Sequence, residues 1–438
     1  MLPIPRLPWL APALLGLVLP AGAGPYSASS GDPSNAFDAP VPGFVGPHGV
    51  GKARLFTFDL DDEGQEIYEN PGNYVNPLFF GWASEAAFYQ PSETVSVSFS
   101  DPERALGPVS GDNFDVVSLG DQSAASIFLG NSPGTITLAF AKPIRDLSGA
   151  DFVIFENGHI TQTNEGGAGV GGIFAELAYV EVSADGETFV PLPATSLNAA
   201  LAVLPGFGTR FASIDATNVF NLAGKHVNAY GQSWGTPFDL AGSGLSQITH
   251  IRLVDVPGSG AYKDSADRPI YDAWKTISSG GFDLEAIGAI SVSMTYAEWP
   301  QLENVPLNRR GPADDPDGDG IPNLLEYACG TLPWLGDAVR PTLVSDPAGK
   351  GLSFLRDERA GDLRYEVQVS ENAATWVTLA SGDGGAPLQA APGQTPLITD
   401  VSAGSIRSVG VIRRTAVSEQ PPAGSTRRFY RLKVTLIP

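Results

Sequence analysis

Short stretches in which apolar and polar residues alternate dominate this chain, and helical periods are nearly absent. The alternating stretches lie at 95–99, 135–140, 179–183, 249–254 and 365–370. An apolar run at 151–155 is typical of a strand buried on both faces. Asp185-Gly186 predicts a tight turn between two paired strands. With 51 glycines and 37 prolines to supply further turns, the pattern predicts an all-β fold.

The strand-rich segments form two predicted units. We expect residues 51–298 to form a jelly-roll-like β-sandwich and residues 341–438 a smaller β-sandwich of immunoglobulin or fibronectin type. Residues 24–50, rich in glycine, proline and serine, predict a flexible arm. Residues 299–340 lack strand patterns and are predicted to be a linker.

The first 23 residues predict export. They carry one basic residue, Arg6, then an apolar core, and then Ala21-Gly22-Ala23, which fits the cleavage site of a secretory signal peptide. This apolar core is too short and too rich in proline for a membrane span, and no other stretch reaches the necessary length. We therefore expect a secreted mature chain without a transmembrane segment.

The predicted linker contains the sharpest chemical pattern in the chain, at residues 315–326. Aspartates stand at loop positions 1, 3 and 5, glycine at position 6 and glutamate at position 12, which is the spacing of an EF-hand calcium loop. Position 7 contributes a main-chain carbonyl. The expected Ca²⁺ ligands are Asp315, Asp317, Asp319, Ile321 and Glu326.

Only half of an EF-hand is predicted. Upstream of the loop, residues 308–313 have no helical period and contain a proline. Downstream, Pro322 suits the start of a helix that runs over 323–329 and ends at Gly330. The loop and its exit helix resemble the calcium loops of dockerins, of thrombospondin type 3 repeats and of DPDGDG linkers in secreted bacterial proteins. A dockerin carries two such loops and this chain has one, so a structural joint is favoured.

The chain is strongly acidic and contains one cysteine. Its formal charge is −22, and the excess of acidic residues lies before residue 341. Such a surface repels nucleic acid and anionic membranes. Cys329 has no partner for an internal disulfide and is expected on the buried face of the short helix.

Several sequence blocks together resemble a family of secreted bacterial cell-surface proteins, of the PEP-CTERM and verrucomicrobial exported types. The blocks are NYVNPLFFGWAS (73–84), DFVIFENG (151–158), FAELAYVEVSADGETFVPLPATSL (174–197), ITHIRLVDVPGSG (248–260) and IYDAWKTISSGGFDLEAIGAI (270–290). Within them, VEVSADGETFVPL is also similar to a hairpin of galactose-binding-like jelly rolls. The resemblance implies an extracellular β-sandwich and no particular activity.

Polar residues at predicted strand ends form a possible second metal or ligand site, because loops carry function on β scaffolds. These residues are Glu156, Asn157, Glu176, Asp255, Asp272, Asp283 and Glu285. Asp59, Asp61 and Asp62 form a further acidic group. Ordinary acidic loops and turn caps are the alternative interpretation.

Aromatic residues and histidines near turns suggest a place for a ligand such as a glycan. Trp234 and Trp274 are the preferred exposed candidates for stacking on sugar rings, and His159 and His226 lie in loops rich in glycine and asparagine. Core packing is the competing interpretation for the aromatic side chains. The glycan partner rests on analogy with other jelly rolls.

Two motif matches are rejected, and we expect no enzyme. The sequence 231–235 fits G-x-S-x-G, but Thr236-Pro237 prevents the helix that must follow a nucleophilic Ser233. The sequence 167–172 fits G-x-G-x-x-G, but a strand pattern follows it. The leading hypothesis is a calcium-binding, non-catalytic extracellular protein. A structural or adhesion protein and a polysaccharide-active enzyme with a carboxylate pair are the alternatives.

Overall fold

The computed structural model describes most of the chain after the predicted signal peptide. The described residues are 24–31, 38–59, 65–93, 95–160, 172–199, 202–203, 214–276, 280–336, 339–346, 349–403, 411–422 and 428–437. Three regions discussed above lie outside the described residues: the predicted signal peptide (1–23), Asp61 and Asp62, and residues 167–171 of the G-x-G-x-x-G match.

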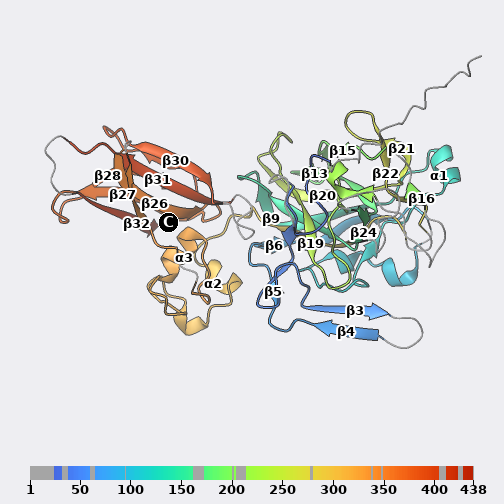
Figure 1. The fold of residues 1–438 in the computed structure, drawn as a ribbon, viewed down its shortest axis with the longest axis horizontal. Coiled ribbons are helices and arrows are strands. Elements are labelled where there is room, and N and C mark those ends of the chain that lie inside the picture. The colour runs from blue at the N-terminus through green and yellow to red at the C-terminus, as the bar shows by residue number, and fades with distance from the viewer. Residues whose placement is uncertain are drawn as a thin grey trace, which may run out of the picture.

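The fold is all-β, as predicted, and has two lobes (Figure 1). The N-terminal unit, residues 24–292, contains two large antiparallel sheets. The first has the order β1 (Val41–Pro42), β19 (Trp234–Phe238), β10 (Phe152–Glu156), β24 (Asp283–Ala289) and β6 (Gly81–Trp82), with β8 (Val117–Ser118) also paired to β24. The second has the order β14 (Val190–Pro191), β13 (Leu177–Ser183), β20 (Gln247–Val256), β9 (Thr135–Arg145) and β7 (Glu85–Gln90).

The N-terminal unit also contains several two-stranded sheets. They pair β2 (Phe44–Val45) with β5 (Tyr74–Val75), β3 (Leu55–Asp59) with β4 (Gln65–Glu69), β15 (Thr195–Ser196) with β18 (Val219–Phe220), β16 (Ala202–Val203) with β23 (Ala273–Trp274), and β21 (Ser259–Lys263) with β22 (Pro269–Tyr271). A further sheet joins β11 (His159–Ile160), β12 (Gly172–Phe174) and β17 (Ile214–Asp215). The short helices are α1 (Ala124–Leu129), η1 (Val97–Phe99), η2 (Pro102–Ala105) and η3 (Ala216–Asn218).

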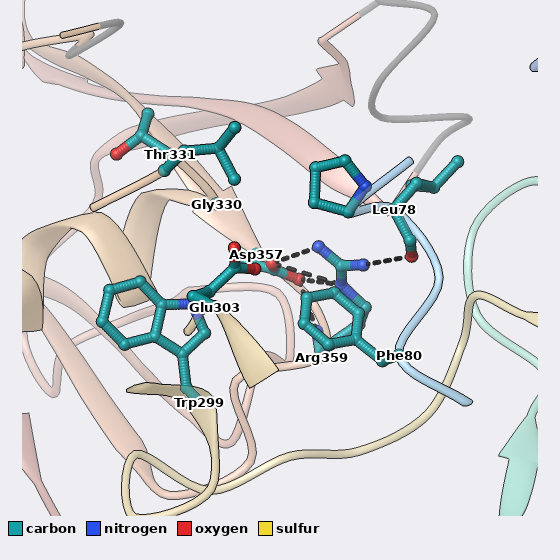
Figure 2. A pocket seen from close by; sticks show the side chains of 10 residues that line it. Leu78, Phe80, Trp299, Glu303, Gly330, Thr331, Asp357 and Arg359 are labelled. Carbon is teal, nitrogen blue, oxygen red and sulfur yellow. Dashed lines mark hydrogen bonds and ion pairs between the residues drawn. The ribbon is translucent and has the colours of Figure 1, made fainter. Parts of the chain in front are cut away.

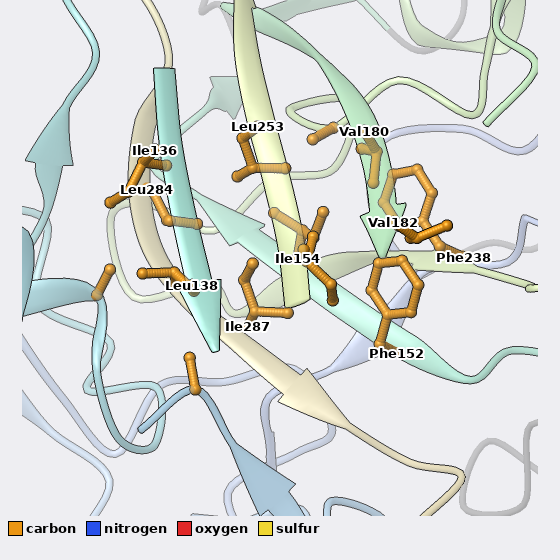
Figure 3. Close-up of a cluster of buried hydrophobic side chains, with 14 of the residues drawn as sticks. Ile136, Leu138, Phe152, Ile154, Val180, Val182, Phe238, Leu253, Leu284 and Ile287 are labelled. Carbon is orange, nitrogen blue, oxygen red and sulfur yellow. The ribbon is translucent and has the colours of Figure 1, made fainter. Parts of the chain in front are cut away.

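The chain alternates between the two large sheets. The strands β9, β13 and β20 belong to one sheet, and β10, β19 and β24, which follow them in turn along the sequence, belong to the other. Their inward side chains form one apolar core, in which Ile136 and Leu253 of one sheet and Ile154 and Ile287 of the other are buried together (Figure 3). Burial of these side chains from both sheets is what holds the layers together.

The C-terminal unit, residues 294–437, also has two antiparallel sheets that share a core. One has the order β25 (Thr342–Asp346), β26 (Gly349–Asp357), β31 (Ile412–Glu419) and β30 (Leu397–Ser402), and the other has the order β29 (Gln389–Ala390), β28 (Val377–Asp383), β27 (Leu363–Ser370) and β32 (Phe429–Leu436). The alternation predicted at 365–370 is confirmed, because Tyr365, Val367 and Val369 point into the core.

The predicted flexible arm is wrong for its described part. Within 24–50, β1 pairs with β19 and β2 pairs with β5. Asp38 is buried and accepts a 2.6 Å hydrogen bond from Lys225 Nζ, which also donates to the carbonyl of Val219 at 2.7 Å. The described residues of this segment therefore belong to the N-terminal unit.

The predicted linker is likewise part of a unit. It contains α2 (Trp299–Leu302), η4 (Leu307–Arg309) and α3 (Asn323–Cys329). Trp299, Tyr327 and Ala328 are buried in the core of the C-terminal unit. The expected strand at 95–99 is also wrong, because Val97–Phe99 form a 3₁₀ turn with Val97 exposed. An alternation of apolar and polar residues over only five positions is readily overridden by tertiary contacts.

An apolar cluster joins the two units. Phe79 from the N-terminal unit and Cys329, Leu355 and Ile412 from the C-terminal unit belong to it. Beside it, the guanidinium of Arg359 donates to the Leu78 carbonyl at 3.0 Å and lies 3.9 Å from the centre of the Phe80 ring (Figure 2). Asp357 accepts hydrogen bonds from the same guanidinium, so the charge of this buried arginine has a carboxylate partner at the joint.

Candidate metal centre

The aspartates of loop 315–326 fold back on the loop's own amides. Asp315 accepts from the N–H groups of Gly318 at 2.8 Å and Gly320 at 3.0 Å. Asp317 accepts from the Asp319 N–H at 3.1 Å, and Asp319 from the Ile321 N–H at 2.9 Å. Gly320 has a φ of +87°, in the left-handed region that glycine tolerates. The turn brings one carboxylate oxygen of each aspartate within 4.8 Å of the other two.

The loop fits a hard cation. Asp317 Oδ2 is shielded from solvent and accepts no hydrogen bond within the described part of the chain. Burial, together with the charges of Asp319 and Asp315, raises the pKa of Asp317. A cation between the three carboxylates would take up this oxygen and offset the repulsion. Carboxylate oxygens in a turning loop are the kind of ligand that Ca²⁺ prefers, and three of its six to eight oxygen ligands could come from these aspartates.

The exit helix forms where the sequence predicts it. Helix α3 spans Asn323–Cys329, is preceded by Pro322 and ends at Gly330 with a φ of +68°. Glu326 lies on this helix and is fully buried, but its carboxylate is not within the 4.8 Å group formed by the three aspartates. The prediction for Cys329 is confirmed, because it is buried, and burial raises the pKa of its thiol to about 12.

A second acidic site lies inside the N-terminal unit. We call it the carboxylate cluster and define it as Asp121, Glu156, Glu176, Asp255, Asp272 and Asp283. Burial raises the pKa of each, and for all but Asp121 and Asp283 the charges of other members raise it further. The sheets assemble the cluster from segments that are far apart in the sequence. It contains five of the seven residues that strand-end reasoning predicted.

The other two predicted residues lie beside the cluster. The Asn157 side chain donates to Asp283 and lowers the pKa of that carboxyl. Glu285 uses both oxygens elsewhere: Oε1 accepts from the N–H groups of Ser110 at 2.7 Å and Gly111 at 2.6 Å, and Oε2 accepts from Asn228. Its carboxylate is therefore satisfied by local donors.

Backbone amides hold the cluster in place. The Gly281 N–H donates to Glu176 at 2.9 Å, and the next amide, Phe282 N–H, donates to Asp255 at 2.9 Å. The Thr276 N–H donates to Asp121 at 2.9 Å, and the Thr276 hydroxyl lies 3.0 Å from the Gly281 nitrogen. Thr276, Gly281 and Phe282 thus anchor three carboxylates from three separate parts of the chain.

Sequence reasoning missed Asp121. It lies between Gly120 and Gln122, where no strand pattern marks the start or end of an element. A third acidic group, Asp146, Asp151 and Asp239, was also missed; its members share the 4.8 Å proximity seen in the loop. Asp151 is buried, but it accepts from the Leu147 N–H at 3.0 Å and the Leu240 N–H at 2.8 Å, so it serves as a cap for two loops.

The expected sugar-stacking residues are less exposed than predicted. The exposure expected for Trp234 is wrong, since its ring is buried against the backbone of Gly31 and Gly51. Trp274 is half-buried, and its indole N–H donates to the Gln122 carbonyl at 3.0 Å. Local sequence cannot show that a distant glycine will cover an indole.

Of the two candidate histidines, one is buried and the other is half-buried. His226 is buried, with its ring nitrogens 3.3 Å from the Ser29 carbonyl and 3.1 Å from the Asp38 carbonyl. His159 stacks on Phe174 with ring centres 5.0 Å apart, and burial lowers its pKa to about 4. These positions give both rings packing roles.

Comparison of the chain with known protein families and with curated proteins found no match. Within the described residues, no helix has the length and apolar character needed to cross a bilayer. Ser233 is buried and is followed at once by strand β19, so the helix required by a nucleophile elbow is missing at this position.

Proposed function

We propose that this chain is a secreted, non-catalytic extracellular protein that binds Ca²⁺ at loop 315–326 and uses the ion to stiffen the joint between its two units. The observation that carries the proposal is the approach of the Asp315, Asp317 and Asp319 oxygens to within 4.8 Å of one another. The spacing of these residues in the loop and the shielded Asp317 oxygen support the same ion.

The position of the loop supports a mechanical role. Helix α3 begins at Asn323, inside the last part of the loop, and its last residue, Cys329, belongs to the apolar cluster that joins the two units. On the same helix, the Tyr327 hydroxyl lies 2.8 Å from the Met294 carbonyl and 2.7 Å from an Asp362 oxygen. An ion that orders the start of α3 would therefore also order the contact between the units.

The N-terminal unit supports a jelly-roll assignment. Successive long strands alternate between two packed sheets, which is the connectivity expected of that fold. Binding of a glycan or another extracellular ligand by this unit stays a prediction, because Trp234 is buried and Trp274 only half-exposed.

Calorimetric titration of Ca²⁺ into chelator-treated protein tests the proposal. Extracellular calcium modules bind at roughly 10⁻⁴–10⁻³ M, and we expect a loop site in that range. Asp317→Ala/Asp319→Ala is expected to remove the heat of that site. The matched control, Glu371→Ala/Asp383→Ala, removes two exposed acids of the C-terminal unit and is expected to keep the site. Equal heats for the two double variants would overturn the proposal.

A further inference from the structure

We propose that the carboxylate cluster is a second site for a divalent cation of the Ca²⁺ type, held directly by Asp121 and Asp255. Both residues are almost completely buried, with 5 % and 1 % of their surface exposed. Each has one oxygen fixed by a backbone amide and a second oxygen, Asp121 Oδ1 or Asp255 Oδ2, that accepts no hydrogen bond from the described residues.

Orphaned oxygens are the independent observation that separates this cluster from an ordinary acidic patch. A buried polar atom without a partner costs free energy, and native structures contain few of them. Asp283 Oδ1 and the carboxamide oxygen of Asn228 share this condition in the same region. The same signature occurs at Asp317 in loop 315–326, where the residue spacing independently indicates a cation.

Charge balance also favours a bound cation. Five of the six carboxylates are almost fully buried, and Lys275 is a basic side chain that lowers the pKa of Asp121. Lys275 is itself paired with Glu93, at 2.7 Å. Elsewhere in the same unit, the buried Asp38 has Lys225 as a direct partner. Buried charges are retained when they are paired or when they coordinate metal.

The geometry sets the expected coordination. Among the described residues, no three carboxylate oxygens of the cluster lie within 4.8 Å of one another, unlike in the loop, and the site that we propose therefore uses two carboxylates. Asp121 and Asp255 are linked through Thr276, Gly281 and Phe282, and the charge of Asp121 is the strongest electrostatic influence on Asp255. Carbonyl oxygens and water complete the shell, as Ca²⁺ permits with its six to eight oxygen ligands.

Terbium luminescence tests this site in folded protein. Trp274 donates its indole N–H to the carbonyl of Gln122, the residue after Asp121, so it lies close enough to sensitise a bound Tb³⁺ ion. The experiment uses Asp317→Ala/Asp319→Ala protein, which lacks the loop site. We expect tryptophan-excited Tb³⁺ emission that Ca²⁺ displaces and that falls severalfold in the added Trp274→Phe variant.

Two further variants complete the test. Asp121→Asn/Asp255→Asn, added to the same background, is expected to abolish the emission while circular dichroism stays unchanged. If that variant does not fold, the Trp274→Phe comparison decides. Absence of emission from folded background protein, or emission that survives both the Trp274 and the aspartate changes, would overturn the second site without touching the loop site, which calorimetry tests separately.

Discussion

The two acidic sites differ in how the chain builds them. Loop 315–326 takes its three aspartates from five consecutive residues and holds them with its own amides. The carboxylate cluster takes its members from segments between Asp121 and Asp283 and needs both large sheets to form. The loop can therefore be recognised in the sequence and can bind an ion with little help, whereas the cluster exists only in the folded N-terminal unit.

The second difference is exposure to solvent. The loop aspartates are half-buried, so water screens much of their repulsion. The cluster members other than Asp283 are almost fully buried, and burial is the largest cause of the raised pKa of every member. Removal of the ion is accordingly expected to cost more at the cluster than at the loop.

The largest expected loss of stability comes from removing the cationic partner of a buried acid. It shows what an unpaired buried carboxylate, like those of the carboxylate cluster, costs in this unit. Lys225→Met leaves Asp38 buried without its partner and is expected to lower the free energy of unfolding by about 3–5 kcal/mol. Urea denaturation measures it. Lys263→Met, which breaks an exposed ion pair with Asp267, is the control and is expected to cost less than about 1 kcal/mol. Similar losses from both changes would show that the unit's interior tolerates unpaired charge.

The next largest effect is the pH dependence of stability caused by His159. It tests whether water is excluded from the region beside Glu156. The pKa of His159 is lowered from 6.5 to about 4 in the folded protein. Below pH 6.5 the unfolded chain therefore binds a proton that the folded chain does not, and stability falls as the pH drops toward 4.

This difference in pKa corresponds to about 3 kcal/mol. His159→Phe keeps the stacking on Phe174 and is expected to remove that part of the loss. The check is urea denaturation at pH 7 and pH 4.5 in calcium-free buffer. An unchanged pH dependence in the variant would mean that His159 is solvated.

Calcium stabilisation at the loop is expected to be smaller. For a dissociation constant near 10⁻⁴ M, 10 mM Ca²⁺ adds about 2.7 kcal/mol to the free energy of unfolding. Asp317→Ala/Asp319→Ala is expected to remove this gain and to leave stability in chelator nearly unchanged, since it also removes the repulsion of the aspartates. Thermal melts with and without Ca²⁺ measure both quantities. A large loss in chelator would contradict a role that depends on the ion.

The smallest effect isolates the backbone of the loop. Gly320→Ala forces a side chain into the left-handed region and is expected to cost about 1 kcal/mol and to weaken Ca²⁺ binding. Gly393→Ala is the matched control, because Gly393 has a φ of +75° and open space around it. Equal losses of stability with a change in Ca²⁺ affinity only at Gly320 would tie that glycine to the site.

The features that could be predicted from the sequence are those set by interactions between residues close together in the chain. Helix α3 begins and ends as expected because Pro322 and Gly330 act on adjacent residues. The buried strand at 151–155 is recognisable from its own apolar residues, and the structure places β10 at Phe152–Glu156. Features that depend on distant contacts were missed: Asp38 pairs with Lys225, Gly51 covers Trp234, and the charge of Asp121 acts on Asp255.

Equilibrium dialysis counts the calcium ions bound per chain and so shows whether both sites bind an ion. We expect two ions for the natural chain, one for Asp317→Ala/Asp319→Ala, one for Asp121→Asn/Asp255→Asn, and none when the four changes are combined. If the natural chain bound one ion and lost it when the loop aspartates were replaced, the loop site would be supported and the second site would be ruled out. If the natural chain bound no ion at millimolar Ca²⁺, neither the loop site nor the second site would exist.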